Sequence, residues 1–297
     1  MSTITILGAT GQVGSQTVNN LLGKGHNLRL IARHADKLQQ FADKKGVEVH
    51  AGDSFNSDFL ASVMKGSDVA MLMIPTNLLA ENTAAYQDEI GKAQIEAIRK
   101  SGIKKVLFLS SVGGHTEEHT GIVAGLARQE IRLKKLEGVD VLILRPTYFM
   151  ENFLGNISMI KNMHINGSAM SADKQFPLIA TRDIAKVIAE KLDQLDWEGK
   201  STLPLLGARD YSMNEVTRVL GESIDQPALS YVQFPYQQAK EAMVQWGISE
   251  SVAQAFTEMS EGINLGYFNT EIRDSSSTTP TTIEDFAKTF AHVYHLN

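Results

Sequence analysis

Three glycines at three-residue spacing follow directly on a short apolar segment near the N-terminus. The segment Thr3–Leu7 is rich in β-branched residues and predicts a buried strand. The glycines Gly8, Gly11 and Gly14 come next, and apolar residues then recur at helical spacing. A strand, a glycine turn and a helix N-terminus together bring free N–H groups and the positive end of the helix dipole to a phosphate. The sequence therefore predicts a nucleotide-binding turn here.

Further short apolar segments alternate with amphipathic stretches along the first half of the chain. Strands are expected at 28–33, 47–50, 69–74, 106–109 and 139–144, and long helices at 82–100 and 124–136. This order predicts right-handed βαβ units, and hence an α/β fold with a doubly wound parallel sheet covered by helices on both faces.

The alternation becomes irregular after residue 150, where methionine-rich and polar segments follow. We therefore expect a dinucleotide-binding domain over residues 1–150 and a smaller C-terminal α/β domain, for a substrate or a partner, over residues 151–297. Residues from about 177 to 200 are expected to pack back on the first domain.

The composition excludes several kinds of site and partner. The 297 residues include no cysteine, so disulfides, thiolate metal sites and a cysteine nucleophile are excluded. The formal charge of −6 argues against binding along a nucleic-acid backbone, and we expect no direct nucleic-acid partner. No stretch approaches the ~20 apolar residues of a membrane span, and no signal peptide is recognisable. We therefore expect a cytoplasmic protein without membrane contact.

The end of the second expected strand bears on the choice of cofactor. In a dinucleotide-binding fold this position faces the adenosine ribose, and an acidic residue there hydrogen-bonds the 2′-hydroxyl. This chain has Arg33 at that position and Lys37 one turn further on. Because a guanidinium grips a 2′-phosphate, the sequence favours NADP(H), with NAD(H) as the alternative. Both residues could instead be solvated surface charges.

Several motifs together point to one family. They are GATGQVG at 8–14, Ala32-Arg33, Gly52-Asp53, LSSVG at 109–113, LRP at 144–146, FMENF at 149–153 and PTTIEDF at 280–286. In this order, and over nearly the whole chain, they resemble the NmrA-like family of atypical short-chain dehydrogenases/reductases. The resemblance implies a Rossmann domain and a small C-terminal domain with NAD(P) in the cleft between them. The family includes NADPH-dependent quinone and dye reductases, and also regulators that bind the dinucleotide without turning it over.

The resemblance also implies particular cofactor contacts. The pyrophosphate and adenosine would lie on Gly8, Thr10, Gly11, Gln12 and Val13. Arg33 would take the 2′-phosphate and Asp53 the adenine, although Asp53 could also cap the following helix. The ribose and nicotinamide would lie against Met73, Ile74, Pro75, Ser110, Ser111 and Val112, with Pro146 and Tyr148 closing over the reactive face. These positions follow the carboxyl ends of strands, where open α/β sheets bind their ligands.

The residues that usually transfer protons in short-chain dehydrogenases are absent. There the serine after strand five is followed by Tyr-x-x-x-Lys, but this chain has no tyrosine between Tyr86 and Tyr148. Ser111 alone is a poor acid, so standard carbonyl–alcohol chemistry is not expected. The remaining candidates for a proton donor are His115, His119 and Tyr148. The histidines are equally explained as solvated loop residues, and Tyr148 as a core aromatic.

The two histidines also match a metalloprotease pattern. Residues 115–119 read H-x-x-E-H, which binds zinc only when a helix brings both histidines to one face. Glycines on both sides leave scarcely a turn of helix, so no metal site is expected.

The segment after residue 148 gives the only indication of a substrate. It is rich in soft and aromatic side chains, namely Phe149, Met150, Phe153, Met159, Met163, Met170 and Phe176. They would form either an adaptable apolar wall for a flat uncharged ligand or ordinary core. The leading hypothesis is an NADPH-dependent oxidoreductase that transfers hydride to a quinone-like or other conjugated, apolar acceptor. The alternative is a non-catalytic redox sensor with a regulatory protein partner, and a homodimer is compatible with both.

Overall fold

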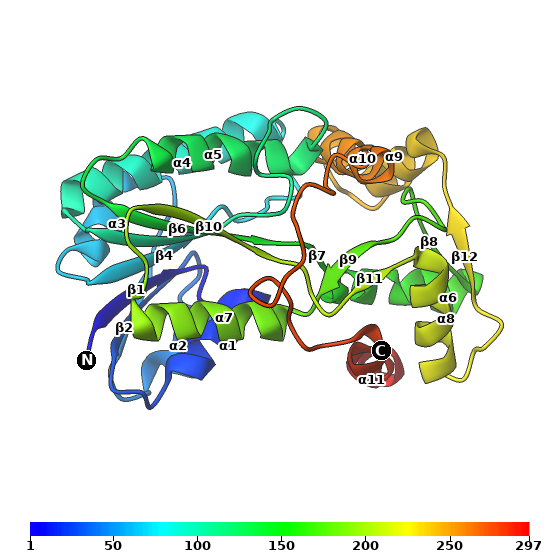
Figure 1. Cartoon of the computed structure of the whole chain (residues 1–297), viewed down its shortest axis with the longest axis horizontal. Helices are drawn as coiled ribbons and strands as arrows, with labels where there is room; N and C mark the ends of the chain where they lie inside the picture. Colours follow the sequence, from blue (N-terminus) through cyan, green and yellow to red (C-terminus); the bar gives the residue numbers. More distant parts are fainter. Residues whose placement is uncertain (297) are drawn as a thin grey trace.

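A seven-stranded parallel sheet forms the centre of the larger part of the molecule (Figure 1). The computed structural model describes residues 1–296. In spatial order the strands are β10 (Lys200–Leu205), β6 (Asp140–Pro146), β5 (Lys105–Leu109), β4 (Val69–Met73), β1 (Thr3–Leu7), β2 (Asn27–Ala32) and β3 (Val47–Ala51). The chain order reverses between β1 and β4, and ligands bind beyond the carboxyl ends of strands at such a point. The expected doubly wound parallel sheet is confirmed.

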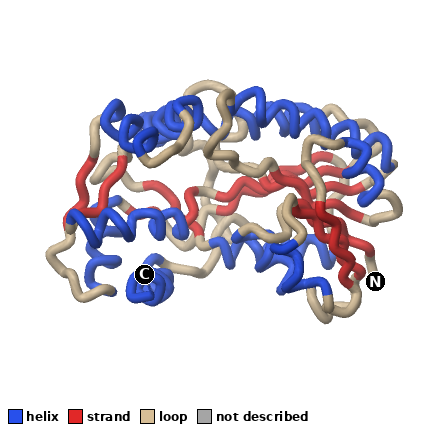
Figure 2. Tube along the Cα trace, turned by 180° about the vertical axis from the view of Figure 1, so that it is seen from behind, coloured by secondary structure: helices blue, strands red, loops and turns tan. Residues whose placement is uncertain are grey.

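Helices cover both faces of this sheet (Figure 2). One face carries α1 (Gln12–Leu21), α2 (Gln39–Ala42) and α7 (Thr181–Gln194), and the other carries α3 (Ser57–Met64), α4 (Thr83–Ser101) and α5 (Ala124–Lys134). Successive strand residues point to opposite faces, so Ile6 lies in the core under α1 and Leu7 in the core under α4. Because both faces are buried at the centre of the sheet, β4, β5 and β6 read as nearly continuous apolar runs.

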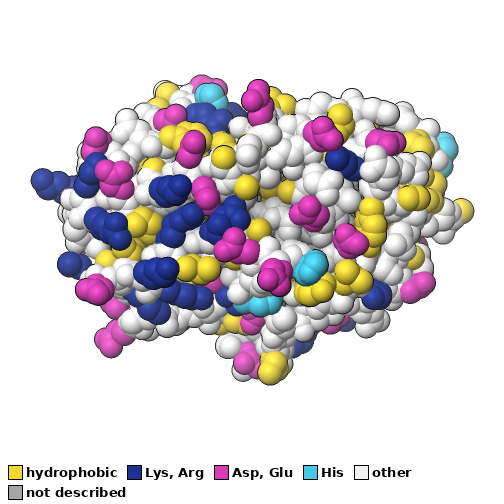
Figure 3. All heavy atoms as spheres, turned by 90° about the horizontal axis from the view of Figure 1, so that it is seen from above, with side chains coloured by type: hydrophobic (Ala, Val, Ile, Leu, Met, Phe, Trp, Pro, Cys, Tyr) yellow, Lys and Arg dark blue, Asp and Glu magenta, His cyan; other side chains and the backbone are white. Residues whose placement is uncertain are grey.

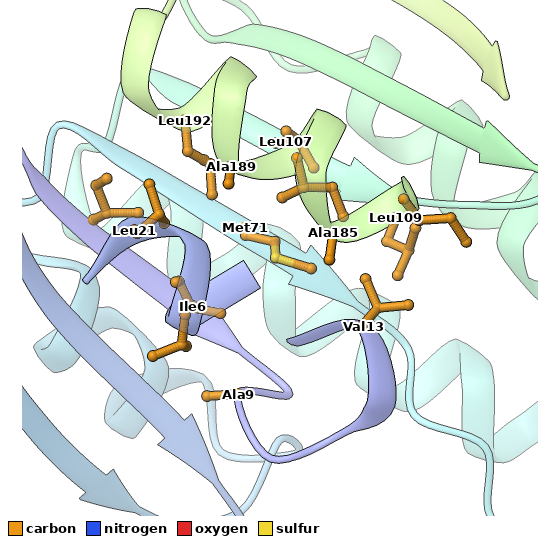
Figure 4. Packing of buried hydrophobic residues seen from close by; sticks show 14 of the residues in the cluster. Ile6, Ala9, Val13, Leu21, Met71, Leu107, Leu109, Ala185, Ala189 and Leu192 are labelled. Carbon is orange, nitrogen blue, oxygen red and sulfur yellow. The ribbon is translucent and has the colours of Figure 1, made fainter. Parts of the chain in front are cut away.

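Helix α7 returns to the first half of the chain. Its small residues Ala185 and Ala189 face Met71 and Leu107 of the sheet, in the same core cluster (Figure 4). The next strand, β10, pairs with β6 and becomes an edge of the sheet. α7 and β10 therefore belong to the central layers although they follow residue 150. The division of the chain into two domains at that residue stays a prediction.

The C-terminal part has two small sheets and a core of its own. β7 (Tyr148–Phe149), β9 (Phe176–Ile179) and β11 (Asp210–Tyr211) form one sheet, and β8 (Ile165–Ser168) and β12 (Ser230–Gln233) form the other. Around them pack the 3-10 helix η3 (Met150–Asn156) and the helices α6 (Ile157–Met163), α8 (Met213–Ser223) and α11 (Ile283–Leu296). Met150 and Phe153 lie in this core, only 0% and 3% exposed, so these two members of the methionine-rich segment serve packing.

Two helices, α9 (Tyr236–Gln245) and α10 (Glu250–Leu265), lie beyond the ends of α4 and α5 (Figure 1). The N-terminus of α10 is fixed to the loop after β4. Ser249 accepts a hydrogen bond from the Val252 amide as N-cap and donates its hydroxyl to the carbonyl oxygen of Ala80, while its own amide donates to Leu78. α10 is thereby held over the carboxyl edge of the sheet.

Basic side chains gather on the outer face of α4 and α5 (Figure 3). Many have acidic partners on the same face: Arg128 and Arg132 both bond Asp88, and Lys100 bonds Asp58. None of the helices in residues 1–296 is long and apolar enough to cross a membrane. A cytoplasmic location stays a prediction.

Candidate functional site

The glycine turn after β1 presents unused backbone donors to solvent. Gly8 has φ of +76°, and the amides of Gly8 and Ala9 donate to the carbonyl oxygen of Ile31 on β2. Helix α1 then begins after Gly11, with no side-chain cap and no acidic residue in its first turn. Its first N–H groups and the positive end of its dipole are therefore available to an anion. This arrangement fits a pyrophosphate.

Gly11 and Gly14 of the turn have different structural roles. A Cβ on Gly14 would lie 2.1 Å from the carbonyl oxygen of Gly8, so only glycine lets α1 approach the end of β1 this closely. A Cβ on Gly11 would lie 3.4 Å from that oxygen, an ordinary contact, and Gly11 is exposed. Gly14 is thus required by the fold, whereas nothing in the protein itself requires glycine at position 11.

The predicted adenosine-binding residues gather at the ends of β2 and β3. Arg33 is exposed, and its Nη2 donates to the hydroxyl of Tyr86 over 3.3 Å. Burial raises the pKa of Tyr86, and the Arg33 charge opposes that rise. Phe55 contacts the Tyr86 ring edge-on at 5.4 Å, and Asp53 accepts a hydrogen bond from the Phe55 amide. Lys37 lies nearby in chain order, exposed on a short 3-10 helix, Asp36–Leu38.

The structure rules out one of the two expected roles of Asp53, the helix cap. Helix α3 is capped by Asn56, whose side chain accepts from the Phe59 amide. Asp53 is therefore not the N-cap of that helix, and its carboxylate stands exposed at the end of β3. Its role toward adenine stays a prediction.

The carboxyl ends of β4, β5 and β6 open into a cavity of about 270 Å³. Predicted contact residues in its lining are Met73, Ile74, Ser110, Ser111, Val112 and Tyr148. Pro75 and Pro146 adjoin this lining in the chain without being part of it. Gln94, fully buried on α4, donates to the carbonyl oxygen of Met73 and so fixes the end of β4. The turn after β1 and this cavity thus lie at the same edge of the sheet.

The other wall of the cavity comes from the end of the chain. Helix α10 contributes Phe256, Met259 and Ile263, and the segment after it contributes Phe268 and Asn269. Sequence reasoning missed all five, because the helical pattern of α10 gives no sign of what the helix will cover.

Glycines allow this wall to close against the loop after β5. A Cβ on Gly113, where φ is +90°, would lie 2.6 Å from the Phe268 ring. A Cβ on Gly121 would lie 2.0 Å from the carbonyl oxygen of Ala255 on α10. Residues 113–121 therefore fit against α10 and the segment after it with no room for side chains at these two positions.

A buried ionic network lies next to the cavity. Glu130 on α5 is 1% exposed and accepts from the Ser110 hydroxyl at 2.7 Å and from two nitrogens of Arg145 at 2.9 and 2.7 Å. Arg145 also donates to Glu271, which follows the Phe268 segment. Burial alone would lower the pKa of Arg145, but the bonds to both glutamates raise it overall. The network joins α5, β6 and the C-terminal wall.

Glu130 was not predicted from the sequence. The sequence pattern that indicates a buried carboxylate is present, because Glu130 shares a helix face with Ala127 and Leu133, which are both buried. A carboxylate on a buried helix face needs charged partners, and Arg145 and Lys134 are those partners.

The candidate proton donors lie in two different environments. His115 and His119 are exposed and lie outside the cavity lining, with His119 stacked on Tyr267 at 4.4 Å. Tyr148 lines the cavity, and burial raises its pKa to about 12, with a hydrogen bond from Asn152 acting in the opposite direction. At neutral pH its hydroxyl is therefore a hydrogen-bond donor and a weak acid.

Residues 115–119 form turns rather than a helix, and His119 has φ of +59°. The two histidines therefore do not take the helical i, i+4 arrangement of a zinc protease. Within residues 1–296 no group of three or more histidine, cysteine, aspartate or glutamate side chains is placed to hold a metal ion.

The chain belongs to the NmrA-like family, whose model matches residues 1–287. An NAD(P)H azoreductase of Xenophilus azovorans is 26% identical over 256 residues, which cover 86% of this chain and 85% of the azoreductase. A quinone oxidoreductase of Escherichia coli, solved with NADPH, has a TM-score of 0.81 at 20% identity, with 99% of both chains covered. The negative transcriptional regulator NmrA, solved with NAD, has a TM-score of 0.64 at 14% identity, covering 97% of this chain and 90% of the regulator.

Replacement of Gly11 separates ligand binding from folding. Gly11→Val should abolish NADPH binding in a calorimetric titration while leaving the circular dichroism spectrum unchanged, because the branched side chain would stand where a pyrophosphate approaches the helix. Gly14→Val is the matched control and should instead lower the melting temperature, because the backbone of Gly8 leaves no space for a side chain at position 14. Normal NADPH binding by Gly11→Val would reduce the turn to a structural role.

Replacement of Glu130 tests the ionic network. Glu130→Gln leaves the Arg145 charge without its main buried partner, so the free energy of unfolding in urea should fall by about 3 kcal/mol or more. The exposed Glu137→Gln is the control and should change it by less than about 0.5 kcal/mol. An equally small change for Glu130→Gln would show that the network contributes little.

Proposed function

We propose that this protein is an NADP(H)-dependent oxidoreductase that reduces quinone-like or other conjugated acceptors by direct hydride transfer. One observation carries the proposal: the residues lining the cavity at the ends of β4, β5 and β6 include no charged side chain and no histidine. Such a cavity suits a flat apolar acceptor and supplies no acid with a pKa near neutrality.

The cofactor is a nicotinamide dinucleotide, as expected from the sequence and as present in the solved relatives. The glycine turn would bind the pyrophosphate, through Gly8, Thr10, Gly11, Gln12 and Val13. Arg33 and Lys37 would bind the 2′-phosphate, and Asp53 the adenine. Met73, Ile74, Pro75, Ser110, Ser111, Val112, Pro146 and Tyr148 would surround the nicotinamide end. The bound dinucleotide would supply the hydride.

The missing Tyr-x-x-x-Lys pair decides which acceptors this chain can serve. Reduction of a simple ketone leaves a strongly basic alkoxide, which needs a positioned acid in the transition state. A quinone takes up one hydride and one proton and becomes a hydroquinone, and its conjugated system spreads the charge before water delivers the proton. Tyr148, with its pKa near 12, would serve by donating a hydrogen bond to the acceptor oxygen.

The apolar wall opposite Ser110 would orient the acceptor. The Ser110 hydroxyl is committed to Glu130, so this side of the cavity offers no free proton. Phe256, Met259 and Phe268 supply the apolar face against which a ring can pack. The protein would therefore contribute the proximity of hydride donor and acceptor, which is worth several kcal/mol.

A second candidate function is a redox sensor that binds the dinucleotide without turning it over. The absence of a catalytic acid favours it, and the NmrA regulator is a structural relative. The two functions separate in one assay, NADPH oxidation by the purified protein against a panel of quinones. Tight NADPH binding with no oxidation would indicate the sensor.

The choice of dinucleotide depends on Arg33. NADPH should bind more tightly than NADH, and Arg33→Asp should erase or invert the preference, because one charge-assisted contact changes affinity by about ten- to a hundredfold. Arg99→Asp, on the exposed end of α4, is the control and should leave the preference unchanged. Equal titration of both dinucleotides by the unmodified protein would contradict the assignment.

The acceptor range tests the chemistry. Quinones should support NADPH oxidation, whereas aliphatic ketones and sugar nucleotides should support little, because no positioned acid is present. Replacing His115 and His119 together by alanine should lower the quinone rate by less than about a hundredfold, since acid catalysis is optional there. Rapid reduction of a simple ketone would mean that another residue does the work of the missing tyrosine.

A further inference from the structure

A second cavity, of about 320 Å³, adjoins the first. It lies among α6, β8, α9 and α10, on the side away from the central sheet. Three residues, Tyr148, Phe256 and Met259, line both cavities. The two spaces are therefore separated by little more than these side chains, and one of the three is a methionine, which changes rotamer easily.

The lining of the second cavity is uncharged throughout. Its residues are Tyr148, Asn156, Met159, Met163, Gly167, Ser168, Ala169, Met170, Phe234, Gln238, Ala239, Ala242, Met243, Trp246, Phe256, Thr257, Met259 and Ser260. Five are methionines, and with the aromatic rings they form a soft apolar wall. The sequence predicts that the methionine-rich segment forms either a pocket or core. Met159 and Met163 line this cavity, and Met170 both lines it and packs in the core of the C-terminal part.

The polar groups around residues 168–170 are satisfied by the protein itself. The Tyr231 hydroxyl bonds the Ser168 hydroxyl at 2.7 Å and the carbonyl oxygen of Met170 at 2.8 Å. Asn264 donates to the carbonyl oxygen of Ala169 at 2.9 Å. An occupant of this cavity would therefore find few polar partners there, which suits a hydrocarbon.

The cavity also reaches solvent through apolar side chains. Helix α9 has no fully buried residue, and Trp246 at its end is 66% exposed. Met163 on α6 is 59% exposed. Exposed apolar side chains beside an apolar cavity fit an entrance for an apolar ligand.

We propose that the second cavity holds an uncharged aliphatic tail of the acceptor whose ring is reduced in the first cavity. The proposal rests on the proposed function and narrows its substrate class to ring acceptors with a hydrocarbon substituent, such as an isoprenoid chain. Continuity through Tyr148, Phe256 and Met259 argues for one ligand spanning both cavities. The absence of charge in the lining argues against a tail that ends in a carboxylate or phosphate.

The test compares two quinones with the same dimethoxy-methyl benzoquinone ring, one without a side chain and one with a decyl chain. Steady-state NADPH oxidation by the full chain gives KM and kcat for each. Burial of even a few methylene groups should lower the KM of the decyl quinone by about tenfold or more, with kcat nearly unchanged.

Two variants fill the second cavity without touching the first. Ala242→Phe and Ala239→Phe, both on α9, should raise the KM of the decyl quinone by about tenfold and leave the plain quinone unchanged. Ala228→Phe, at an exposed position outside both cavities, is the matched control and should change neither value. Two variants are used so that misfolding of one, detected by circular dichroism, leaves the other as the test.

The outcomes separate the two proposals. If both quinones are reduced with equal KM, in the unmodified protein and in the variants, the tail site is overturned and the proposed function stands. If neither is reduced, both are overturned. If KM is equal and Ala242→Phe instead converts a dimer to a monomer in light scattering, the face of α9 binds a second copy of the chain and the tail site is overturned.

Discussion

The contact on which the site depends is the approach of helix α1 to the end of β1. The carbonyl oxygen of Gly8 lies only 2.1 Å from the position that a Cβ of residue 14 would take, so the helix can start here only because residue 14 is glycine. That close approach aims the first N–H groups of α1 across the carboxyl edge of the sheet. Buried cores on both sides hold the strands that carry this edge. A dinucleotide laid along the edge would run from Arg33 on one side of the turn to the cavity at β4, β5 and β6 on the other.

A second constraint, the ion pairs of Arg145, holds the C-terminal wall of the cavity against that edge of the sheet. Arg145 at the end of β6 bonds Glu130 on α5 and Glu271 after α10, so one guanidinium joins the sheet to the wall of the cavity. Gly113 and Gly121 bring the loop after β5 against the same wall. These contacts enclose the first cavity, whose uncharged lining comes from segments more than a hundred residues apart. The second cavity, also apolar, lies behind Tyr148. Under the proposed function, both cavities would favour a conjugated acceptor over a polar one.

The parallel sheet and the glycine turn could be predicted because each is indicated by residues that are close together in the sequence. The parallel sheet follows from apolar runs of strand length, and the turn at Gly8, Gly11 and Gly14 from glycines between a strand and a helix. The family resemblance implies that Met73, Ser110 and Tyr148 surround one ligand, and this agrees with parallel strands bringing their carboxyl ends to one edge. The family resemblance is based on the order of these motifs along the chain.

The remaining features depend on contacts between distant segments. Nothing in the sequence of α10 indicates that Phe256 and Met259 will face β5 and β6 across a cavity. The sequence also does not separate the methionines that fill the core, such as Met150, from those that line a space, such as Met159. The place of Glu130 on a buried helix face indicates that it needs a charged partner, but the sequence does not show that this partner is Arg145 at the end of β6.

The central claim is that this chain passes hydride directly from NADPH to a quinone. The most direct measurement is a single-turnover reaction of the protein–NADPH complex with a benzoquinone, followed by stopped-flow absorbance, using NADPH with hydrogen or deuterium at the transferred position. The account predicts that bound NADPH is oxidised about two- to fivefold more slowly when it carries deuterium. The reason is that breaking the carbon–hydrogen bond of NADPH limits the rate when no acid catalyst is needed. NADPH that stays bound and unoxidised, whichever isotope it carries, would contradict the account.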